Sequence, residues 1–184
     1  MKTINMIITF FIALIVAGCS ASGMIYDLAA DERSVTAIAS DSVITSTIQK
    51  SILEAGDMKI LDISVYCYNG HVYLVGEYDK IAQKEKAAKI AKSTSGVKQV
   101  DVRLFPKKQN DACGTKDNLL IKGKLEAMIL ADTDIWTPID VEVVQCTIIL
   151  LGIVETKEEM ASIVAHAKSV EGSRGVISYL KATQ

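Results

Sequence analysis

Two stretches of the chain carry hydrophobic residues at the spacing of an amphipathic helix. Their apolar positions are Ile44, Ile48 and Ile52 in the first stretch, and Ile121, Leu125 and Ile129 in the second. Spacing of i, i+4 and i+8 places three side chains on one helical face, which can then pack against a core. Asp41 stands before the first stripe and Asp117 before the second. Because Asp is a favourable N-cap, we expect the two helices to begin at these residues.

A strand with Asp in second place follows each predicted helix. These strands span residues 61–65 and 139–143. In the first repeat, Asn69 and Gly70 separate two short runs, 63–68 and 71–75, that are rich in β-branched and aromatic residues. The dipeptide predicts a hairpin with a type I′ turn, because both central residues of that turn need a positive φ.

The turn fixes how the strands of the first hairpin face each other. The opposed pairs that follow are Tyr68 with His71, Cys67 with Val72, and Val65 with Leu74. Because side chains alternate between the two faces of a strand, one face is aliphatic and the other is largely aromatic. The two sets are Ile63, Val65, Cys67, Val72 and Leu74, and Tyr66, Tyr68, His71, Tyr73 and Val75. The aliphatic face is the expected core face.

A glycine closes each hairpin and leads into a second helix. Gly76 has this place in the first repeat, and Gly152 follows the apolar run 148–151 in the second. A Gly-Val pair then opens a closing strand in each repeat. The expected elements are helices over 79–95 and 156–170, and strands over 97–105 and 176–181. The order helix, hairpin, helix, strand therefore occurs twice.

The second hairpin departs from the first at its turn. It is two residues shorter between Asp140 and Gly152 than the first is between Asp62 and Gly76. Its turn falls on Gln145-Cys146, and neither residue type favours a positive φ. The geometry of this turn stays open.

The repeated pattern resembles BON modules, over residues 41–105 and 117–184 with a linker at 106–116. The features that carry the resemblance are the helix after Asp, the Asn69-Gly70 hairpin, Gly76 or Gly152, the Ala-rich second helix and the Gly-Val pair. The resemblance implies an α+β fold in which each module has a small three-stranded mixed sheet covered by helices. It also implies no catalysis, and roles in phospholipid binding and envelope integrity.

The N-terminus has the features of a secretory leader. Lys2 precedes an apolar run, Ile7 to Val16, that is too short to span a bilayer and has the length of a signal-peptide core. The run ends in Val16-Ala17-Gly18-Cys19, which resembles a bacterial lipobox. We expect residues 1–18 to be removed, Cys19 to be lipidated, for instance with palmitate, and 19–40 to form a linker. A plain secreted protein and an uncleaved anchor are the alternatives.

Residue 20 and the composition bear on location and partners. By the same resemblance, Ser20 in place of Asp favours the outer membrane, with the modules facing the periplasm. The mean hydropathy of +0.27 owes much to the leader, and loss of Lys2 changes the formal net charge from −2 to −3. A nucleic-acid-binding domain is usually strongly basic, so we expect no nucleic-acid partner.

Enzyme signatures are missing from the sequence. It has no G-x-S-x-G motif, and Gly123-Lys124 is followed by Leu125 and not by Ser or Thr, so the phosphate-loop pattern fails. The histidines, His71 and His166, lack metal-ligand spacing to another His or Cys. We expect no catalytic residue, metal, cofactor or small-molecule substrate.

Three cysteines remain once lipidation has used Cys19, and export exposes them to an oxidising compartment. The hairpin register points Cys67 into the core. Cys113 lies in the linker and Cys146 near a hairpin tip, so they form the preferred pair if any pair is bridged. Three reduced thiols are the alternative, since the cysteines could lie farther apart than a disulfide spans.

The start of the second module combines basic and apolar residues. The candidate contacts with membrane lipid are Lys116, Leu119, Leu120, Lys122, Lys124 and Trp136. Lysines attract anionic headgroups, while leucine and indole side chains favour the apolar and interfacial zones. A solvated linker and helix face is the alternative for the lysines, and Trp136 could instead fill the second core. Ile121 and Leu125 are the expected core residues of this helix.

Two functional hypotheses follow. In the first, the chain is a non-enzymatic outer-membrane lipoprotein that binds anionic phospholipid at the inner leaflet and supports envelope integrity. In the second, it is a periplasmic chaperone or adaptor that offers sheet edges, or the face with Tyr66, Tyr68 and Tyr73, to envelope proteins. Binding of the unlipidated domain to vesicles would discriminate between them.

Overall fold

The computed structural model describes residues 31, 33–56, 58 and 62–184. The expected signal peptide, Cys19 and Ser20 lie outside the described residues. Residues 32–184 form one compact unit, which contains both repeats. Its elements are α2 (Val35–Glu54), β1 (Ile63–Tyr68), β2 (His71–Tyr78), α3 (Ile81–Ser93), β3 (Gln99–Pro106), α4 (Thr115–Ala131), β4 (Asp140–Val144), β5 (Thr147–Val154), α5 (Lys157–Ser169) and β6 (Gly175–Ala182).

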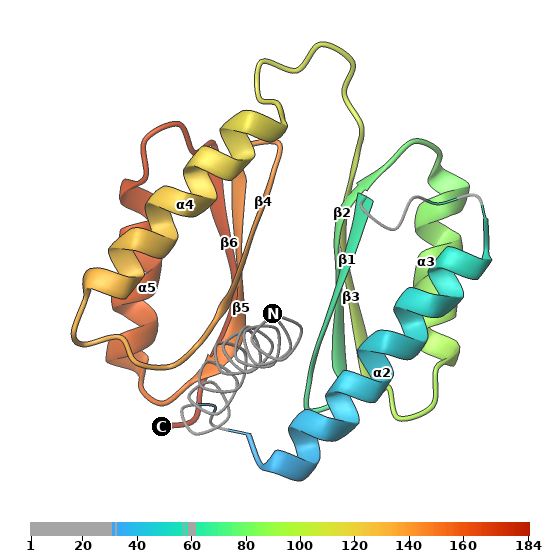
Figure 1. The fold of residues 1–184 in the computed structure, drawn as a ribbon, viewed down its shortest axis with the longest axis horizontal. Coiled ribbons are helices and arrows are strands. Elements are labelled where there is room, and N and C mark those ends of the chain that lie inside the picture. Colours follow the sequence, from blue (N-terminus) through green and yellow to red (C-terminus); the bar gives the residue numbers. More distant parts are fainter. Residues whose placement is uncertain (1–30, 32, 57, 59–61) are drawn as a thin grey trace, which may run out of the picture. The chain divides into compact units, whose positions relative to one another are not determined.

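Each repeat folds as a three-stranded mixed sheet with two helices on one face (Figure 1). The strand orders are β1-β2-β3 and β4-β5-β6. In each sheet the central strand pairs antiparallel with the first strand and parallel with the last, which returns across a helix. The predicted α+β fold of two tandem modules is therefore confirmed.

The predicted helix stripes fill the two cores. Ile48, Ile52 and Leu125 are at most 1% exposed, and Ile44 and Ile121 are also buried. The aliphatic face of the first hairpin packs against the α2 stripe, together with Ala87 and Ala91 of α3. The register predicted for that hairpin is also confirmed, because Tyr68 pairs with His71, Cys67 with Val72 and Val65 with Leu74.

Both helix starts were predicted incorrectly. The first helix begins at Val35, where the Ser34 hydroxyl accepts a hydrogen bond from the Ala37 N–H, so Ser34 is the N-cap. Asp41 lies two turns inside the helix and is buried. The second helix begins at Thr115, and the Asp117 carboxylate in its first turn accepts a bond from the Gly114 N–H. Each Asp therefore binds a backbone donor, but neither is the cap residue.

Gly76 and Gly152 lie where the antiparallel pairing of the hairpins ends. Gly76 pairs with Ile63 in the last pair of the first hairpin, and Gly152 follows Leu151, which closes the second. Strands β2 and β5 continue for two residues beyond the glycines, paired in parallel with β3 and β6. Gly76 has a φ of +141°, and a Cβ there would approach the carbonyl oxygen of Asp62 to 2.0 Å. Glycine is required because the neighbouring strand leaves no room for a side chain.

The aromatic face of the first hairpin is covered. A third apolar cluster joins the two sheets on the faces turned away from the helices, and its buried members include Tyr73 and Val75 of β2 and Ile149 and Leu151 of β5. Tyr73 is only 2% exposed. The tyrosine face that the chaperone hypothesis offers to client proteins is therefore occupied by the second module.

Within the described ranges, no helix combines the length and the apolar character needed to cross a membrane.

Candidate functional site

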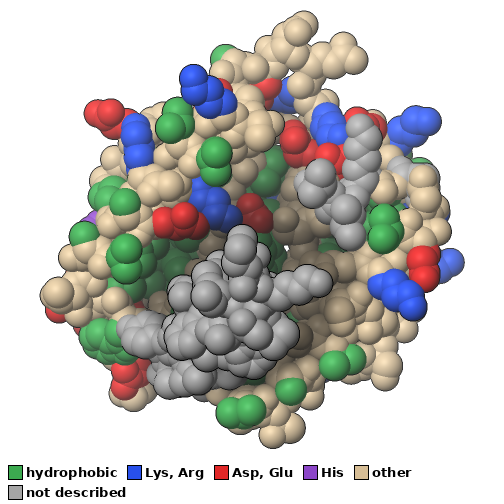
Figure 2. All heavy atoms as spheres, in the orientation of Figure 1, with side chains coloured by type: hydrophobic (Ala, Val, Ile, Leu, Met, Phe, Trp, Pro, Cys, Tyr) green, Lys and Arg blue, Asp and Glu red, His purple; other side chains and the backbone are tan. Residues whose placement is uncertain are grey.

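The outward face of α4 carries exposed apolar and basic side chains. Leu119 is 69% exposed and Leu120 is 53% exposed, and the nearby Lys116 and Lys124 are also exposed. Figure 2 shows apolar side chains along α4, with basic and acidic ones between them. The opposite face of the helix carries Ile121 and Leu125 into the core, as expected.

The sequence-based candidates did not include one apolar residue of this face. Leu130, in the last turn of α4, is 88% exposed. Gly123 and Ala127 are exposed between it and Leu120, so the outward stripe runs the length of the helix with little bulk at its centre. The spacing 120, 123, 127, 130 is itself a helical stripe, and a search for a second stripe on the helix would have found it.

Two other predicted contacts have protein partners. The Lys122 ammonium is only partly exposed and lies 4.0 Å from a carboxylate oxygen of Glu142. Trp136 is 46% exposed, and its indole N–H donates a hydrogen bond of 3.0 Å to the Glu155 carboxylate. Trp136 is therefore at the surface and does not fill the second core.

A hollow of about 340 Å³ lies beside the start of α4. It is bounded by the helix, by the disulfide and by the loop before β6. Its lining includes Leu120, Ile121, Lys124, Asp117, Glu171 and Arg174. Apolar and charged groups of both signs thus meet next to the exposed leucines.

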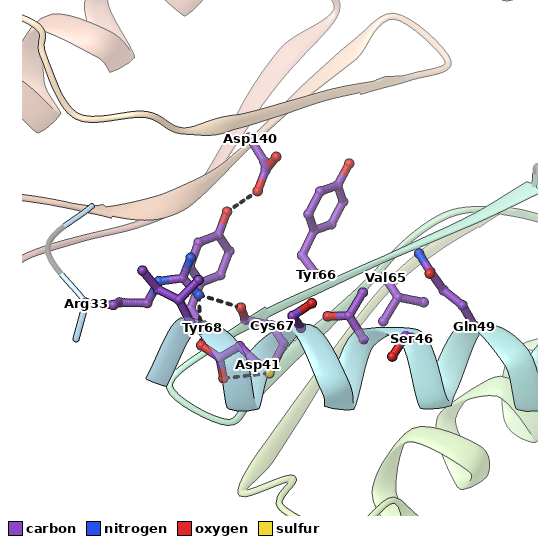
Figure 3. A pocket seen from close by; sticks show the side chains of 12 residues that line it. Arg33, Asp41, Ser46, Gln49, Val65, Tyr66, Cys67, Tyr68 and Asp140 are labelled. Carbon is purple, nitrogen blue, oxygen red and sulfur yellow. Dashed lines mark hydrogen bonds and ion pairs between the residues drawn. The ribbon is translucent and has the colours of Figure 1, made fainter. Parts of the chain in front are cut away.

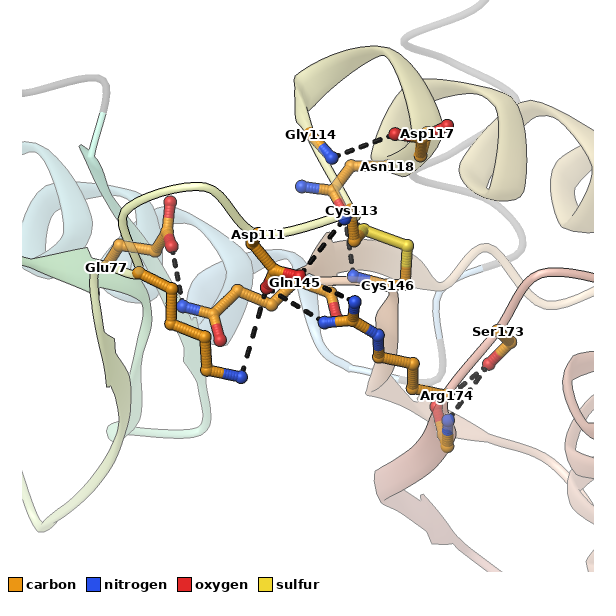
Figure 4. The surroundings of a disulfide bond; sticks show 12 residues. Glu77, Asp111, Cys113, Gly114, Asp117, Asn118, Gln145, Cys146, Ser173 and Arg174 are labelled. Atoms are coloured by element: carbon orange, nitrogen blue, oxygen red, sulfur yellow. Dashed lines mark hydrogen bonds and ion pairs between the residues drawn. A yellow bond between two sulfur atoms is a disulfide. The ribbon is translucent and has the colours of Figure 1, made fainter.

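The disulfide joins Cys113, just before α4, to Cys146 in the turn of the second hairpin, with 5.8 Å between their Cα atoms (Figure 4). The preferred pairing is therefore confirmed. Gln145 and Cys146 have φ values of 51° and 60°, so the turn has the left-handed geometry that its sequence does not favour. The Asn118 side chain of α4 accepts a bond of 2.9 Å from the Cys146 N–H and so supports the same turn.

Further contacts hold the second turn from both sides. Arg174 binds Asp111 through two guanidinium hydrogen bonds of 2.6 and 2.8 Å, and these lower the pKa of that carboxyl. The Gln145 amide donates to the Glu77 carboxylate of β2 and to the carbonyl of Pro106 at the end of β3. Figure 4 shows these residues converging between linker, turn and loop.

In the first module the corresponding turn is held by one carboxylate. Asp41 accepts hydrogen bonds from the N–H groups of Asn69 and Gly70, at 2.7 and 2.8 Å (Figure 3). Burial opposes ionisation of Asp41, but these bonds, together with those from the Cys67 thiol and Arg33, lower its pKa. Cys67 is buried, and this burial and the neighbouring Asp41 raise its pKa to about 12, so its thiol is unreactive.

The groove shown in Figure 3 ends at polar contacts between the modules. Tyr68 donates to the carboxylate of Asp140, and Tyr66 donates to that of Glu142. Burial raises the pKa of Asp140, although the Tyr68 hydroxyl acts in the opposite direction. Asp41 and Asp140 thus both have hydrogen-bond partners within the chain.

The two histidines lie apart, and each contacts an aspartate carboxylate. His71 is 2.6 Å from Asp101, and His166 is 2.7 Å from Asp132 at the end of α4. In the part of the chain that the structure describes, no group of three or more His, Cys, Asp or Glu side chains is placed to hold a metal ion.

Comparisons with known proteins identify the repeats. Residues 40–104 and 117–184 each match the family model described as BON domain. Osmotically-inducible protein Y of Escherichia coli (strain K12) is 28% identical over 144 residues, which cover 77% of this chain and 72% of that protein. A protein of Anaplasma centrale named for the gshII 5′ region is 26% identical over 151 residues, covering 77% of this chain and 93% of its own.

Solved structures give a weaker likeness. The C-terminal domain of CdsD, a structural protein of the type III secretion system of Chlamydia trachomatis, aligns with a TM-score of 0.32 and 12% identity. The alignment covers 78% of this chain and 67% of that one.

Proposed function

Because this chain belongs to the BON-domain family and carries two copies of the domain, we propose that it is a non-enzymatic envelope lipoprotein whose second module contacts phospholipid. The outward face of α4 is the proposed contact. The observation that carries the proposal is the pair Leu119 and Leu120, exposed on a helix whose flanks carry Lys116 and Lys124. Large apolar side chains exposed side by side next to cations are typical of surfaces that lie on membranes.

The two kinds of side chain contribute differently to binding. Lysines near an anionic surface each contribute about 1 kcal/mol, and salt weakens this attraction because the Debye length falls from about 10 Å at 0.1 M to about 3 Å at 1 M. Each leucine contributes up to about 1.5 to 3 kcal/mol if it is fully removed from water. Lysines therefore provide the preference for anionic lipid, and leucines provide the part of the affinity that salt does not remove.

The proposed location rests on the leader and on the relatives. Lipidation of Cys19 would hold the modules at the periplasmic side of the outer membrane, within reach of the inner leaflet. A relative that is named for osmotic induction, from Escherichia coli, supports a role in the response of the envelope to osmotic stress. Protein clients are the alternative, and for these the sheet edges would have to serve, because the tyrosine face packs against the second sheet.

Flotation with lipid vesicles tests the contact. The mature polypeptide with Cys19→Ser, which carries no acyl chain, should float with vesicles that contain anionic phospholipid. Lys116→Glu with Lys124→Glu should abolish this binding, and Leu119→Asp should weaken it even at low salt. The matched control is Lys89→Glu with Lys92→Glu on α3, which changes the net charge by the same amount. It should lose only the part of the binding that depends on net charge and should keep the rest. Equal loss in both double variants would refute α4 as the site.

Lipidation has its own test. Cys19→Ala in the full chain should leave an unprocessed precursor, whereas the parent should yield a mature N-terminus that carries acyl mass. Mass spectrometry of a mature parent without acyl mass would refute the anchor but would leave the α4 contact untouched.

A further inference from the structure

We propose that the hollow beside α4 binds a zwitterionic headgroup, namely a phosphate ester that carries a primary ammonium group. The inference rests on the proposed membrane contact, because the hollow opens beside the leucines of that surface. It adds a lipid specificity that the surface lysines alone would not provide.

The first observation is a pair of opposite charges without protein partners in one hollow. Lys124 on α4 and Glu171 in the loop before β6 both line the hollow and are both exposed. Within the described part of the chain, neither side chain makes a hydrogen bond or an ion pair, with each other or with any other group. A cation and an anion that share a hollow without pairing leave space for a ligand that carries both charges.

The other two charged residues of the hollow differ in how far their charges are paired. Arg174 binds Asp111 in a two-bond pair, whereas Asp117 accepts only the Gly114 N–H and has no cationic partner. Lys124 is thus the lining cation without an ion pair, and Glu171 and Asp117 are the lining anions without one. The hollow therefore disfavours a purely anionic ligand and suits one that carries a cationic group beside its phosphate.

The second observation concerns the apolar residues that line the hollow next to the exposed leucines. Ile121, Cys113 and Cys146 line the hollow and are buried, whereas Leu120 lines it and is 53% exposed. A headgroup in the hollow would place its phosphate near Lys124 and its ammonium near Glu171. The acyl chains would then leave past Leu120 towards the bilayer. The volume of about 340 Å³ is at the small end of ligand sites, as a headgroup requires.

The charge pattern distinguishes this ligand from a purely anionic one. An anionic headgroup would pair with Lys124 but would leave Glu171 unpaired beside a second negative charge. A quaternary ammonium could approach Glu171 but has no N–H group to donate to it, whereas a primary ammonium has three. The hollow should therefore prefer phosphoethanolamine over phosphocholine, although both headgroups are neutral.

The test compares vesicles of equal surface charge. The mature polypeptide with Cys19→Ser, kept oxidised, is floated with vesicles of phosphatidylcholine alone and of phosphatidylcholine mixed with phosphatidylethanolamine. We expect about fivefold greater partitioning onto the mixed vesicles, the scale of one exposed charge pair. Glu171→Gln should remove this preference and keep the binding to anionic vesicles. Its matched control is Glu158→Gln, an exposed carboxylate of α5 outside the hollow, which should keep both.

A soluble headgroup separates the hollow from the bilayer. Glycerophosphoethanolamine should shift the amide resonances of Lys124 and Glu171 in an NMR titration of the parent, and Glu171→Gln should reduce these shifts. Shifts without any vesicle binding would support the headgroup site and refute the membrane contact. Binding to anionic vesicles without preference for the mixed neutral vesicles, or a preference that survives Glu171→Gln, would overturn the headgroup site alone.

Discussion

The two hairpin turns reach the same backbone geometry by different means. In the first module, Asn69 and Gly70 have φ values of 54° and 80°, and both residue types adopt such angles readily. In the second module, Gln145 and Cys146 have φ values of 51° and 60°, where a side chain makes the conformation costly. The first turn follows from its own residues, and the second depends on contacts from outside it.

In both modules a side chain of the first helix accepts hydrogen bonds from the turn. Asp41 and Asn118 each stand three residues before the first core isoleucine of their helix, and each side chain accepts N–H groups from the facing turn. The second module adds the disulfide and the Arg174 contacts, where the first needs only the carboxylate and Arg33. A turn can therefore lack residues that favour a positive φ if contacts from the surrounding structure hold its backbone in that conformation.

Loss of the disulfide should have the largest effect on this comparison. Its cysteines are 33 residues apart, and closing a loop of that length stabilises a protein by about 3 to 4 kcal/mol through the unfolded state. Cys113→Ser with Cys146→Ser should lower the free energy of unfolding by this amount in urea. Hydrogen exchange should quicken in β4 and β5 far more than in β1 and β2. Equal acceleration in both hairpins would show that the bond does not act on the second turn.

Removing the carboxylate from the first turn should have the next largest effect. Asp41→Ala removes the acceptor of the buried Gly70 N–H and of the part-buried Asn69 N–H, and also the ion pair with Arg33, which should cost about 3 kcal/mol in the free energy of unfolding. Asp41→Asn should cost less, since an amide oxygen still accepts one bond. Glu54→Ala at the exposed end of α2 is the control and should change little.

The same residue predicts a dependence on pH. The pKa of Asp41 is lowered by folding from its usual value of 3.8, so its stabilising contribution is complete above that value and is lost as the pH falls through the lowered pKa. The difference between parent and Asp41→Ala should therefore shrink in acid. A difference that is constant from pH 7 to the acid limit would mean that the ionised form is not what holds the turn.

Placing glycine in the second turn should have a smaller effect, in the opposite direction. In the Cys113→Ser background, Cys146→Gly should recover about 1 kcal/mol, because glycine tolerates the positive φ while Gln145 keeps its bonds to Glu77 and Pro106. The melting temperature relative to Cys113→Ser with Cys146→Ser measures the recovery. No gain would mean that the surrounding contacts impose the turn at no cost.

The smallest effect is expected from replacing Asp62 and Asp140, which occupy equivalent positions in the two modules. Asp62 forms an ion pair of 2.6 Å with Lys107, whereas desolvation raises the pKa of Asp140, so charged Asp140 lowers stability as the pH rises above its usual 3.8. Asp140 keeps exposed surface, and solvent screening keeps this effect small. At pH 7, Asp140→Asn should keep the Tyr68 bond and change the free energy of unfolding by less than about 1 kcal/mol, towards stability. Asp62→Asn should lower it by up to about 1 kcal/mol. The opposite order would show that Asp140 gains more from Tyr68 than it loses by burial.

The sequence predicted the parts of the fold that depend on local signals. Helical spacing found the core stripes, and Asn69-Gly70 found the first turn and its register. The helix starts were wrong because an Asp before a stripe has the same pattern whether it caps the helix or points at a turn from inside it. The function of Asp41 depends on the hairpin 28 residues away, which a local pattern does not contain.

Parts that depend on packing between modules could not be predicted. Alternation gave two faces for the first hairpin, but only the second sheet decides that the aromatic face is buried as well. At the candidate site, the exposure of Leu119 and Leu120 followed from the core choice of Ile121 and Leu125. The hollow could not be predicted in this way, because Glu171 lies more than 40 residues after Lys124 in the sequence and only the fold brings it beside α4.

The disulfide also changes what a cut in the chain would do. The segment between Cys113 and Cys146 contains all of α4 and β4, so it is a covalent ring within the second module. A protease that cleaves any one bond of this ring leaves both fragments attached, so in an oxidising compartment the nicked chain would keep α4. On a denaturing gel without reductant the nicked protein would migrate as one species. With reductant it would separate into two fragments.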